Sequence, residues 1–177
     1  MCEPAMKKRY QFKIVVAGDG GVGKTSLLNR YVSNRFITAM KMTIGTEFLS
    51  KTLETEDWII KLQLWDFGGE EQFRYILPYY YPGSHGVILA FDMNDFNTMM
   101  NLGEWLQLIR ECTLDPVVIL VGCKSDLSDF LDEDLIEEFC LKNDIDGFIP
   151  TSAKTGENVE RLFQEFARRI LAKHMDF

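Results

Sequence analysis

The chain has 177 residues, of which 46% are hydrophobic and 26% charged, and this composition is typical of a globular protein rather than a disordered one. It has 27 acidic and 19 basic residues, and the net charge of −8 disfavours nucleic acid or an anionic membrane surface as a partner of the folded body. No apolar run approaches the roughly 20 residues of a membrane span. At this length we expect one domain with its own core.

Four cysteines are spread along the chain: Cys2, Cys112, Cys123 and Cys140. Their spacing is typical neither of a metal site nor of a disulfide framework, and the basic N-terminal stretch is not followed by the apolar run of a secretory signal. These features predict a protein of the reducing cytoplasm. We expect residues 1–9 to form a flexible N-terminal extension and residues 10–177 to form the domain.

Extended apolar runs alternate with helical patterns along the whole chain. A tight polar connection at Thr55-Glu56-Asp57 predicts an antiparallel hairpin, and two later runs are continuously apolar, as in strands covered on both faces. The order predicts an α/β domain whose six-stranded sheet is mostly parallel, with one antiparallel strand and helices on both faces. Strands are expected at 12–17, 47–54, 58–65, 86–91, 116–121 and 148–149, and helices at 25–32 and within 102–109, 135–140 and 159–170.

The strongest local motif is Gly18-Asp19-Gly20-Gly21-Val22-Gly23-Lys24-Thr25, which fits G-x-x-x-x-G-K-[ST] and lies between a predicted strand and a predicted helix. Glycines let successive backbone N–H groups point at phosphate oxygens, and the helix N-terminus adds positive potential. The Lys24 ammonium can reach the outer phosphates, and the Thr25 hydroxyl can ligate Mg²⁺. The motif predicts a nucleoside triphosphate site without identifying the base.

Four later segments narrow the choice of nucleotide. Asp66 ends an apolar strand before Gly68-Gly69, where a carboxylate can hold a Mg²⁺-bound water and the glycine backbone can turn toward a γ-phosphate. Asp126, in Lys124-Ser125-Asp126, can accept from both N1–H and the exocyclic amine of guanine, a pair that adenine lacks. The segment Thr151-Ser152-Ala153-Lys154 can offer a backbone N–H to the guanine oxygen, and Thr43 lies in a loop after the first helix.

With these five segments in order, the chain resembles the Ras superfamily of small GTPases over roughly Tyr10 to Lys173. The segments 43–48, 61–66 and 79–86 make it most similar to the Rab branch. The resemblance implies a single P-loop GTPase domain that binds GTP or GDP with Mg²⁺, hydrolyses GTP and signals through nucleotide-dependent loops. A role in membrane traffic would follow from the same resemblance.

The resemblance also implies a role for individual residues. Thr25, Thr43 and Asp66 would serve Mg²⁺, with Thr43 doing so only while a γ-phosphate is present. Phe36 would pack edge-on against guanine, Lys124 would lie along the base, and Ala153 would supply the backbone donor. The implied catalytic residues are Glu70, Lys24, Thr43 and Gly69. The implied nucleotide-binding residues are Gly20, Gly21, Val22, Gly23, Lys24, Thr25, Ser26, Phe36, Thr43, Gly69, Lys124, Asp126, Ser152, Ala153 and Lys154.

Three kinds of protein partner follow from the resemblance: effectors, an exchange factor and a GTPase-activating protein. Phe48, Trp65 and Tyr80 match the aromatic triad through which Rab proteins meet effectors, although packing in the core is the alternative. The short segment 31–42 leaves no room for an inserted domain with its own arginine, so we expect the activating protein to supply that arginine.

Two positions depart from the superfamily pattern. Glu70 stands where a glutamine usually orients the attacking water, and a carboxylate beside the γ-phosphate can only accept hydrogen bonds, which predicts slow hydrolysis. The alternatives are that Glu70 acts as a competent base or that the protein is an interaction module with negligible hydrolysis. Cys123 stands where an asparagine usually ties the base pocket to the phosphate loop, which predicts weaker nucleotide binding and faster exchange. A P-loop ATPase or kinase is disfavoured by Asp126.

The C-terminal segment bears on membrane attachment. A Rab-like protein usually continues into a tail with prenylated cysteines, whereas no cysteine follows Cys140 in the chain as given. We therefore expect a cytoplasmic protein without membrane contact of its own. Peripheral membrane attachment is expected only if a lipidated tail follows the given sequence.

Overall fold

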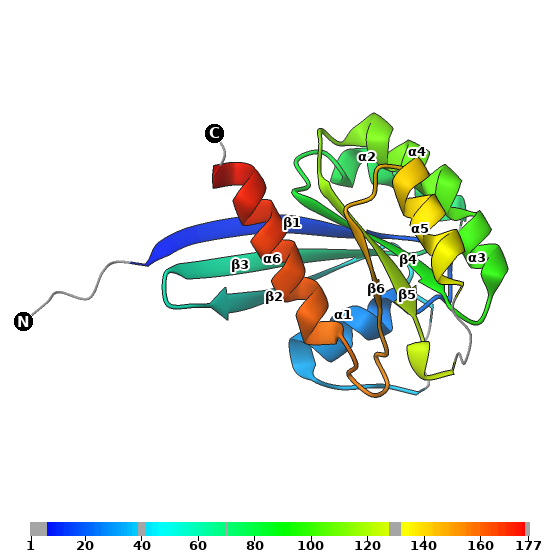
Figure 1. Cartoon of the computed structure of the whole chain (residues 1–177), viewed down its shortest axis with the longest axis horizontal. Helices are drawn as coiled ribbons and strands as arrows, with labels where there is room; N and C mark the ends of the chain where they lie inside the picture. Colours follow the sequence, from blue (N-terminus) through cyan, green and yellow to red (C-terminus); the bar gives the residue numbers. More distant parts are fainter. Residues whose placement is uncertain (1–6, 39–41, 70, 128–131, 176–177) are drawn as a thin grey trace, which may run out of the picture.

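A central six-stranded sheet runs through the computed structural model, which describes residues 7–38, 42–69, 71–127 and 132–175 (Figure 1). The strand order is β2-β3-β1-β4-β5-β6. The strands are β1 (Lys8–Ala17), β2 (Thr46–Glu54), β3 (Trp58–Phe67), β4 (Gly86–Asp92), β5 (Val117–Cys123) and β6 (Gly147–Pro150). The helices are α1 (Lys24–Ser33), α2 (Leu77–Tyr80), α3 (Phe96–Met100), α4 (Leu102–Cys112), α5 (Glu133–Lys142) and α6 (Val159–Met175), with 3₁₀ turns η1 (Glu71–Ile76) and η2 (Ser125–Leu127).

The pairing of the strands confirms the predicted α/β class. Strand β2 pairs antiparallel with β3, while β3, β1, β4, β5 and β6 pair in parallel. The Thr55 N–H donates to the Trp58 carbonyl at 2.9 Å and closes the predicted hairpin. Strand β1 begins at Lys8 rather than Phe12, because its first residues pair with the start of β3, from Lys8 opposite Trp58 onward. The division of the chain at residue 10 stays a prediction.

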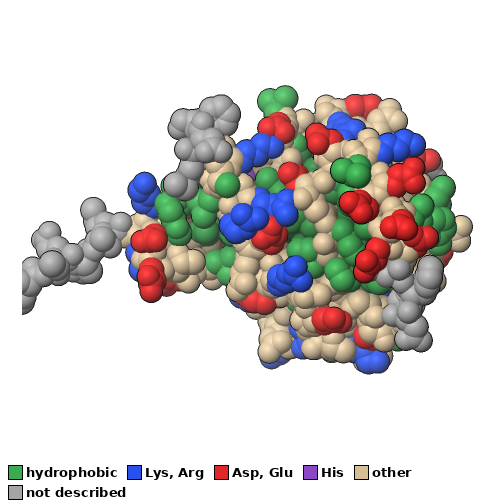
Figure 2. Space-filling view, in the orientation of Figure 1, with side chains coloured by type: hydrophobic (Ala, Val, Ile, Leu, Met, Phe, Trp, Pro, Cys, Tyr) green, Lys and Arg blue, Asp and Glu red, His purple; other side chains and the backbone are tan. Residues whose placement is uncertain are grey.

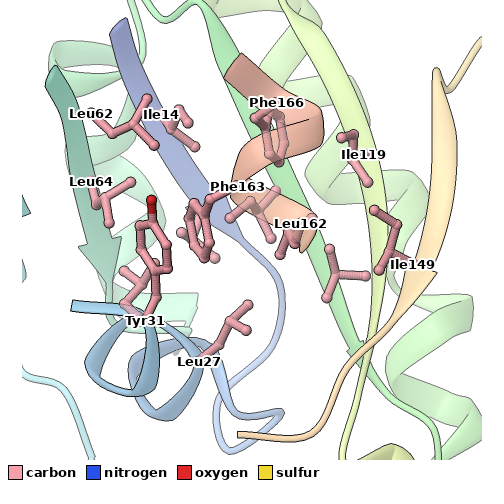
Figure 3. Close-up of a cluster of buried hydrophobic side chains, with 14 of the residues drawn as sticks. Ile14, Leu27, Tyr31, Leu62, Leu64, Ile119, Ile149, Leu162, Phe163 and Phe166 are labelled. Carbon is pink, nitrogen blue, oxygen red and sulfur yellow. The ribbon is translucent and has the colours of Figure 1, made fainter. Parts of the chain in front are cut away.

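Two apolar clusters cover the two faces of the sheet. Successive strand residues point to opposite faces, so Ile14 joins the cluster under α1 and α6, whereas Val15 joins the one under α2–α5. In the first cluster the rings of Tyr31 and Phe163 stack with centroids 3.7 Å apart, which joins α1 to α6 on the same face of the sheet (Figure 3). In the second, Trp105 of α4 is 2% exposed. Helix α1 is therefore held rigidly, and the loop before it is well positioned.

Two features concern possible contact with a membrane: the charges on the face seen in Figure 2 and the length and hydropathy of the helices. Figure 2 shows acidic and basic side chains interspersed over the face that carries α5 and α6. Among the described residues, no helix is both long and apolar enough to cross a bilayer.

The carboxyl ends of the parallel strands open on one edge of the sheet. There β1 leads into α1, β3 leads toward η1, and β5 and β6 lead into the loops before α5 and α6. Ligands of open α/β sheets bind at this edge. The four sequence segments predicted to contact a nucleotide through these loops are thus brought to one place.

Candidate nucleotide-binding site

The glycine-rich loop between β1 and α1 has a backbone that only glycines adopt without strain. Gly21 and Gly23 have φ angles of 76° and 114°. A Cβ on Gly18 would lie 2.1 Å from the Ala90 carbonyl oxygen of β4, so the loop also passes too close to the sheet for a side chain. The loop ends at Gly23, the N-cap of α1, where unpaired backbone N–H groups favour an anion.

Lys24, the first residue of α1, lies buried over this loop. Its Nζ donates to the carbonyl oxygens of Gly18 at 2.8 Å and Asp19 at 2.7 Å. Burial lowers the pKa of the Lys24 ammonium, and the nearby Asp66 carboxylate opposes this shift. A buried cation is stabilised by an anionic partner, so the position suits the outer phosphates of a nucleotide.

Three oxygen-bearing side chains converge beside Lys24. The Thr25 hydroxyl donates to the Asp66 carboxylate, and its oxygen lies 2.7 Å from the Thr43 hydroxyl oxygen. Burial raises the pKa of Asp66, and its Oδ1 atom has no hydrogen-bond partner among the described residues. Hydroxyl and carboxylate oxygens are the ligands that Mg²⁺ prefers, and an orphaned buried oxygen is satisfied by such a cation. These residues therefore fit the Mg²⁺ ion that the fold implies.

Gly69, two residues after the end of β3, packs directly against the phosphate loop. A Cβ at this position would lie 2.3 Å from the Gly20 backbone nitrogen and 2.5 Å from Lys24 Nζ, so no side chain fits there. The preceding N–H, that of Gly68, donates to the Gly45 carbonyl at 3.0 Å. This bond joins the segment after β3 to the one that carries Thr43. The following residue, Glu70, lies outside the described residues.

The residues predicted to read the base meet at the ends of β5 and β6. Ser152 Oγ donates to Asp126 Oδ1 at 2.5 Å, and Lys154 Nζ lies 3.8 Å from Asp126 Oδ2. Lys124 Nζ forms an ion pair with Asp92 Oδ2 at 2.6 Å. Asp126 and Lys124 are thus both held in place by contacts with neighbouring loops.

One cavity of about 440 Å³ joins the phosphate and base halves. It is lined by all the predicted nucleotide-binding residues except Val22 and Ser152, which are both buried. Val22 belongs to the core under α1, and Ser152 contributes through its bond to Asp126. Asp66 stands behind Thr25 rather than on the cavity wall.

Several lining residues were not predicted as site residues, and they include Leu27, Ile37, Thr38, Met42, Phe67, Leu127 and Thr151. Leu127 and Thr151 directly adjoin predicted residues, so adjacency to a motif was a usable signal for them. Ile37 and Thr38 follow Phe36 in a segment without regular structure, and no sequence pattern marked them. Asp92, the partner of Lys124, was also missed, although it ends an apolar strand in the same way as Asp66.

Cys123 lies at the junction of the two halves. It is 3% exposed, and a Cβ on Gly23 of the phosphate loop would lie 3.4 Å from the Cys123 Cβ atom. Burial raises the pKa of the thiol to about 12. The side chain is therefore a neutral thiol that packs against the loop, and it lacks the thiolate character of a reactive cysteine.

Three aromatic side chains form a row beside the site. The rings of Phe48 and Trp65 are 5.0 Å apart at their centroids, and those of Trp65 and Tyr80 are 5.5 Å apart. Phe48 is 48% exposed, whereas Trp65 and Tyr80 are half-buried against the core. The row therefore has an exposed end on β2 and an anchored end on α2.

Comparison with known proteins agrees with this geometry. The Ras family profile matches residues 13–172. The chain is 39% identical to human Ras-related protein Rab-9A, an alignment covering 93% of this chain and 85% of the relative. It is 43% identical to Ras-related protein Rab-11B of Dictyostelium discoideum (87% and 71% covered) and 39% identical to GTP-binding protein ypt1 of Schizosaccharomyces pombe (91% and 80%). The chain therefore belongs to the Ras family of GTP-hydrolysing enzymes and, within it, to the Rab branch.

Proposed function

We propose that this GTPase is a slow switch, which keeps its triphosphate state for a long time, and that it acts in membrane traffic. The observation that carries the proposal is the single cavity that joins the phosphate and base halves of the site. Lys24, Thr25 and Thr43 line its phosphate end, with Asp66 bonded to Thr25 behind the wall, and Asp126 lines its base end. Membership of the Rab branch supports the switch role and the traffic setting.

The phosphate end of the cavity supports phosphoryl transfer by positioning charge. Lys24 would exchange its two carbonyl acceptors for phosphate oxygens, and the backbone N–H groups of the loop would hold the same group. Mg²⁺, held by Thr25 and Thr43 with Asp66 behind them, would neutralise charge that develops on the phosphates.

The switch follows from how Thr43 and Gly69 are held. Thr43 contacts the site through the Thr25 hydroxyl, and the Gly68–Gly45 hydrogen bond ties its segment to the end of β3. Loss of the γ-phosphate would remove a shared anchor of both segments, which would then be free to rearrange.

Glu70 is the reason to expect slow turnover. A glutamine amide both accepts from the attacking water and donates toward the phosphate, whereas a carboxylate only accepts and carries like charge. The alternative is a GTP-binding interaction module with negligible hydrolysis, which the same residue also favours. Acceleration would come from an arginine supplied by a GTPase-activating protein, and reloading would need an exchange factor.

The exposed end of the aromatic row supports an effector surface. Two other exposed apolar side chains precede Phe48 in the sequence and flank Thr43: Met42 is 59% exposed and Ile44 is 86% exposed. An effector docking there would contact Thr43's segment directly and so sense the nucleotide. Phe48→Ala is expected to weaken effector binding to the GTP-loaded protein while leaving GDP affinity unchanged.

Single-turnover hydrolysis tests the proposal. The protein is loaded with GTP, Mg²⁺ is added, and the bound nucleotide is followed by chromatography over hours. A slow, measurable conversion to GDP supports the slow switch. Stoichiometric retention of intact GTP for many hours would favour the module, and binding of ATP in preference to GTP would contradict both.

A further inference from the structure

Arg30, on the last turn of α1, joins two loops that border the base end of the cavity. Its Nε donates to the Ala153 carbonyl at 2.7 Å, and its Nη2 donates to the Lys154 carbonyl. Its Nη1 donates to the Asn34 carbonyl at 3.1 Å and lies 3.3 Å from Asn34 Oδ1. Figure 1 shows the corresponding placement, with α1 beside the loop that connects β6 to α6.

The loop held by Arg30 presents an unused donor to the cavity. Within the described part of the chain, the Ala153 N–H donates to no protein acceptor, whereas Ser152 N–H donates to the Glu157 carbonyl at 3.1 Å. Ala153 also lines the cavity. The direction of this N–H depends on how Ala153 is held. The Gly156 N–H donates to the Ser152 carbonyl of its own peptide unit at 2.8 Å, and Arg30 binds the carbonyls of the two peptide units that follow.

The same arginine stands on the helix that starts at the phosphate loop. Helix α1 begins at Lys24, and the ring of Tyr31 fixes it against Phe163 of α6. The bonds of Arg30 therefore set the distance between the phosphate loop and the base loop. A planar guanidinium with several donors is suited to binding two carbonyl groups of one loop and the Asn34 segment at once.

We propose that Arg30 is a positioning residue for base recognition, which holds the Ala153 N–H where it meets the O6 oxygen of guanine. This proposal rests on the proposed assignment of the base site. Arg30 is not among the residues that line the cavity, so its effect would be transmitted by the loop and would depend on the presence of O6.

The test combines a protein change with changes to the base of the ligand. Affinities of wild type and Arg30→Gln are measured for GDP and for inosine diphosphate, which keeps O6 but lacks the exocyclic amine. They are also measured for 2-aminopurine riboside diphosphate, which lacks both O6 and the N1–H; the loss of N1–H affects both proteins alike, so the comparison rests on the ratio between the two proteins. The matched control is Arg169→Gln, because Arg169 likewise donates to a loop carbonyl, that of Asp146, but away from the cavity.

Arg30→Gln is expected to weaken the binding of GDP and of inosine diphosphate by the same factor, about tenfold, as for loss of a charge-assisted hydrogen bond. The 2-aminopurine nucleotide, which has no O6 to lose, should change by less than about twofold. Arg169→Gln should leave all three affinities within that range. Equal weakening of all three nucleotides by Arg30→Gln would overturn the proposal, and so would no weakening of any.

A second variant keeps the proposal falsifiable if Arg30→Gln does not fold. Arg30→Lys keeps the charge but has one donor group in place of the fork, so the same dependence on O6 is expected with a smaller factor. A loss that is uniform across the three ligands would again overturn the proposal. A wild-type protein that binds ADP as well as GDP would instead contradict the assignment of the base site.

Discussion

Trp105 of α4 donates from Nε1 to the Asp19 carboxylate of the phosphate loop at 2.8 Å. The same carboxylate accepts from Asn101 Nδ2 at 2.7 Å, and Arg74 Nη2 lies 3.9 Å from it. The Arg74 guanidinium also lies over the Trp105 ring, 4.6 Å from its centroid, and bonds to Glu104 at 2.7 Å. The segment after β3 is thus docked on α4 and on the loop that would hold the phosphates.

Trp105→Phe tests this docking because it keeps a ring for Arg74 but removes the hydrogen-bond donor together with part of the buried indole. We expect a loss of at least about 1 kcal/mol in the free energy of unfolding, since the loss of one buried hydrogen bond adds to the loss of buried volume, and faster release of GDP. Denaturant unfolding and the release of a fluorescent GDP analogue measure the two effects. Trp58→Phe in the hairpin is the control, and a Trp105 variant that matches it in both assays would refute the coupling.

Glu70→Gln tests the origin of slow turnover. The amide restores a group that both accepts from water and donates toward the γ-phosphate, so single-turnover hydrolysis should rise at least about tenfold. Glu56→Gln, in the hairpin turn, is the charge-matched control and should leave the rate unchanged. If the Glu70 variant hydrolyses GTP no faster than the wild type, the Glu70 carboxylate is not the cause of slow hydrolysis.

Cys123→Asn tests the junction between the two halves of the cavity. An asparagine amide can donate to and accept from the backbone of the adjacent phosphate loop, which the neutral thiol does poorly. We expect GDP dissociation to slow by about tenfold, as for one or two gained hydrogen bonds. Cys140→Asn on α5 controls for the substitution itself. An unchanged dissociation rate at position 123 would exclude this role for the residue.

His85 gives the fold a dependence on pH away from the nucleotide site. Its Nδ1 accepts from the Lys13 N–H at 3.0 Å, which requires the uncharged ring. Burial lowers the pKa of His85, and the nearby His174 and Lys13 lower it further. Because the folded pKa lies below the unfolded one, this contribution to stability is present above about pH 6.5 and is lost as the pH falls toward the folded value.

His85→Asn should remove that dependence, since an amide oxygen can accept the same N–H without titrating. The free energy of unfolding, measured from pH 8 to below 6, should fall for the wild type and stay flatter for the variant. His174→Asn keeps the His85–Lys13 hydrogen bond but removes one group that lowers the pKa of His85, so its curve should lie between the other two. Parallel curves for wild type and His85→Asn would contradict this assignment.

The sequence predicted those parts of the fold that strong local patterns determine. The continuous apolar runs became β4 and β5, and the short polar connection at Thr55-Glu56-Asp57 became the hairpin turn. The early start of β1 was missed, because Lys8 and Arg9 are polar and pair with β3 on an exposed projection of the sheet. Helix α3 was also missed, because its five residues are too few to show a helical period of apolar side chains.

The predicted site residues share a pattern as well. Those that a motif marks by spacing, such as Lys24 and Asp126, line the cavity. Arg30 and Asp92 were not predicted, because each acts through a partner far away in sequence, Ala153 in one case and Lys124 in the other. Contacts of this kind depend on how the helices and strands pack, and no local pattern specifies them.

Asp126→Asn tests the central claim, that this cavity reads guanine through Asp126, most directly. A carboxylate accepts from the N1–H and exocyclic amine of guanine, whereas an amide can donate to the oxygen that xanthine carries in place of that amine. Competition among GDP, xanthosine diphosphate and ADP is measured for wild type and variant. The account predicts that the wild type prefers GDP and that the variant prefers xanthosine diphosphate. A variant that keeps the wild-type preference for GDP would contradict it.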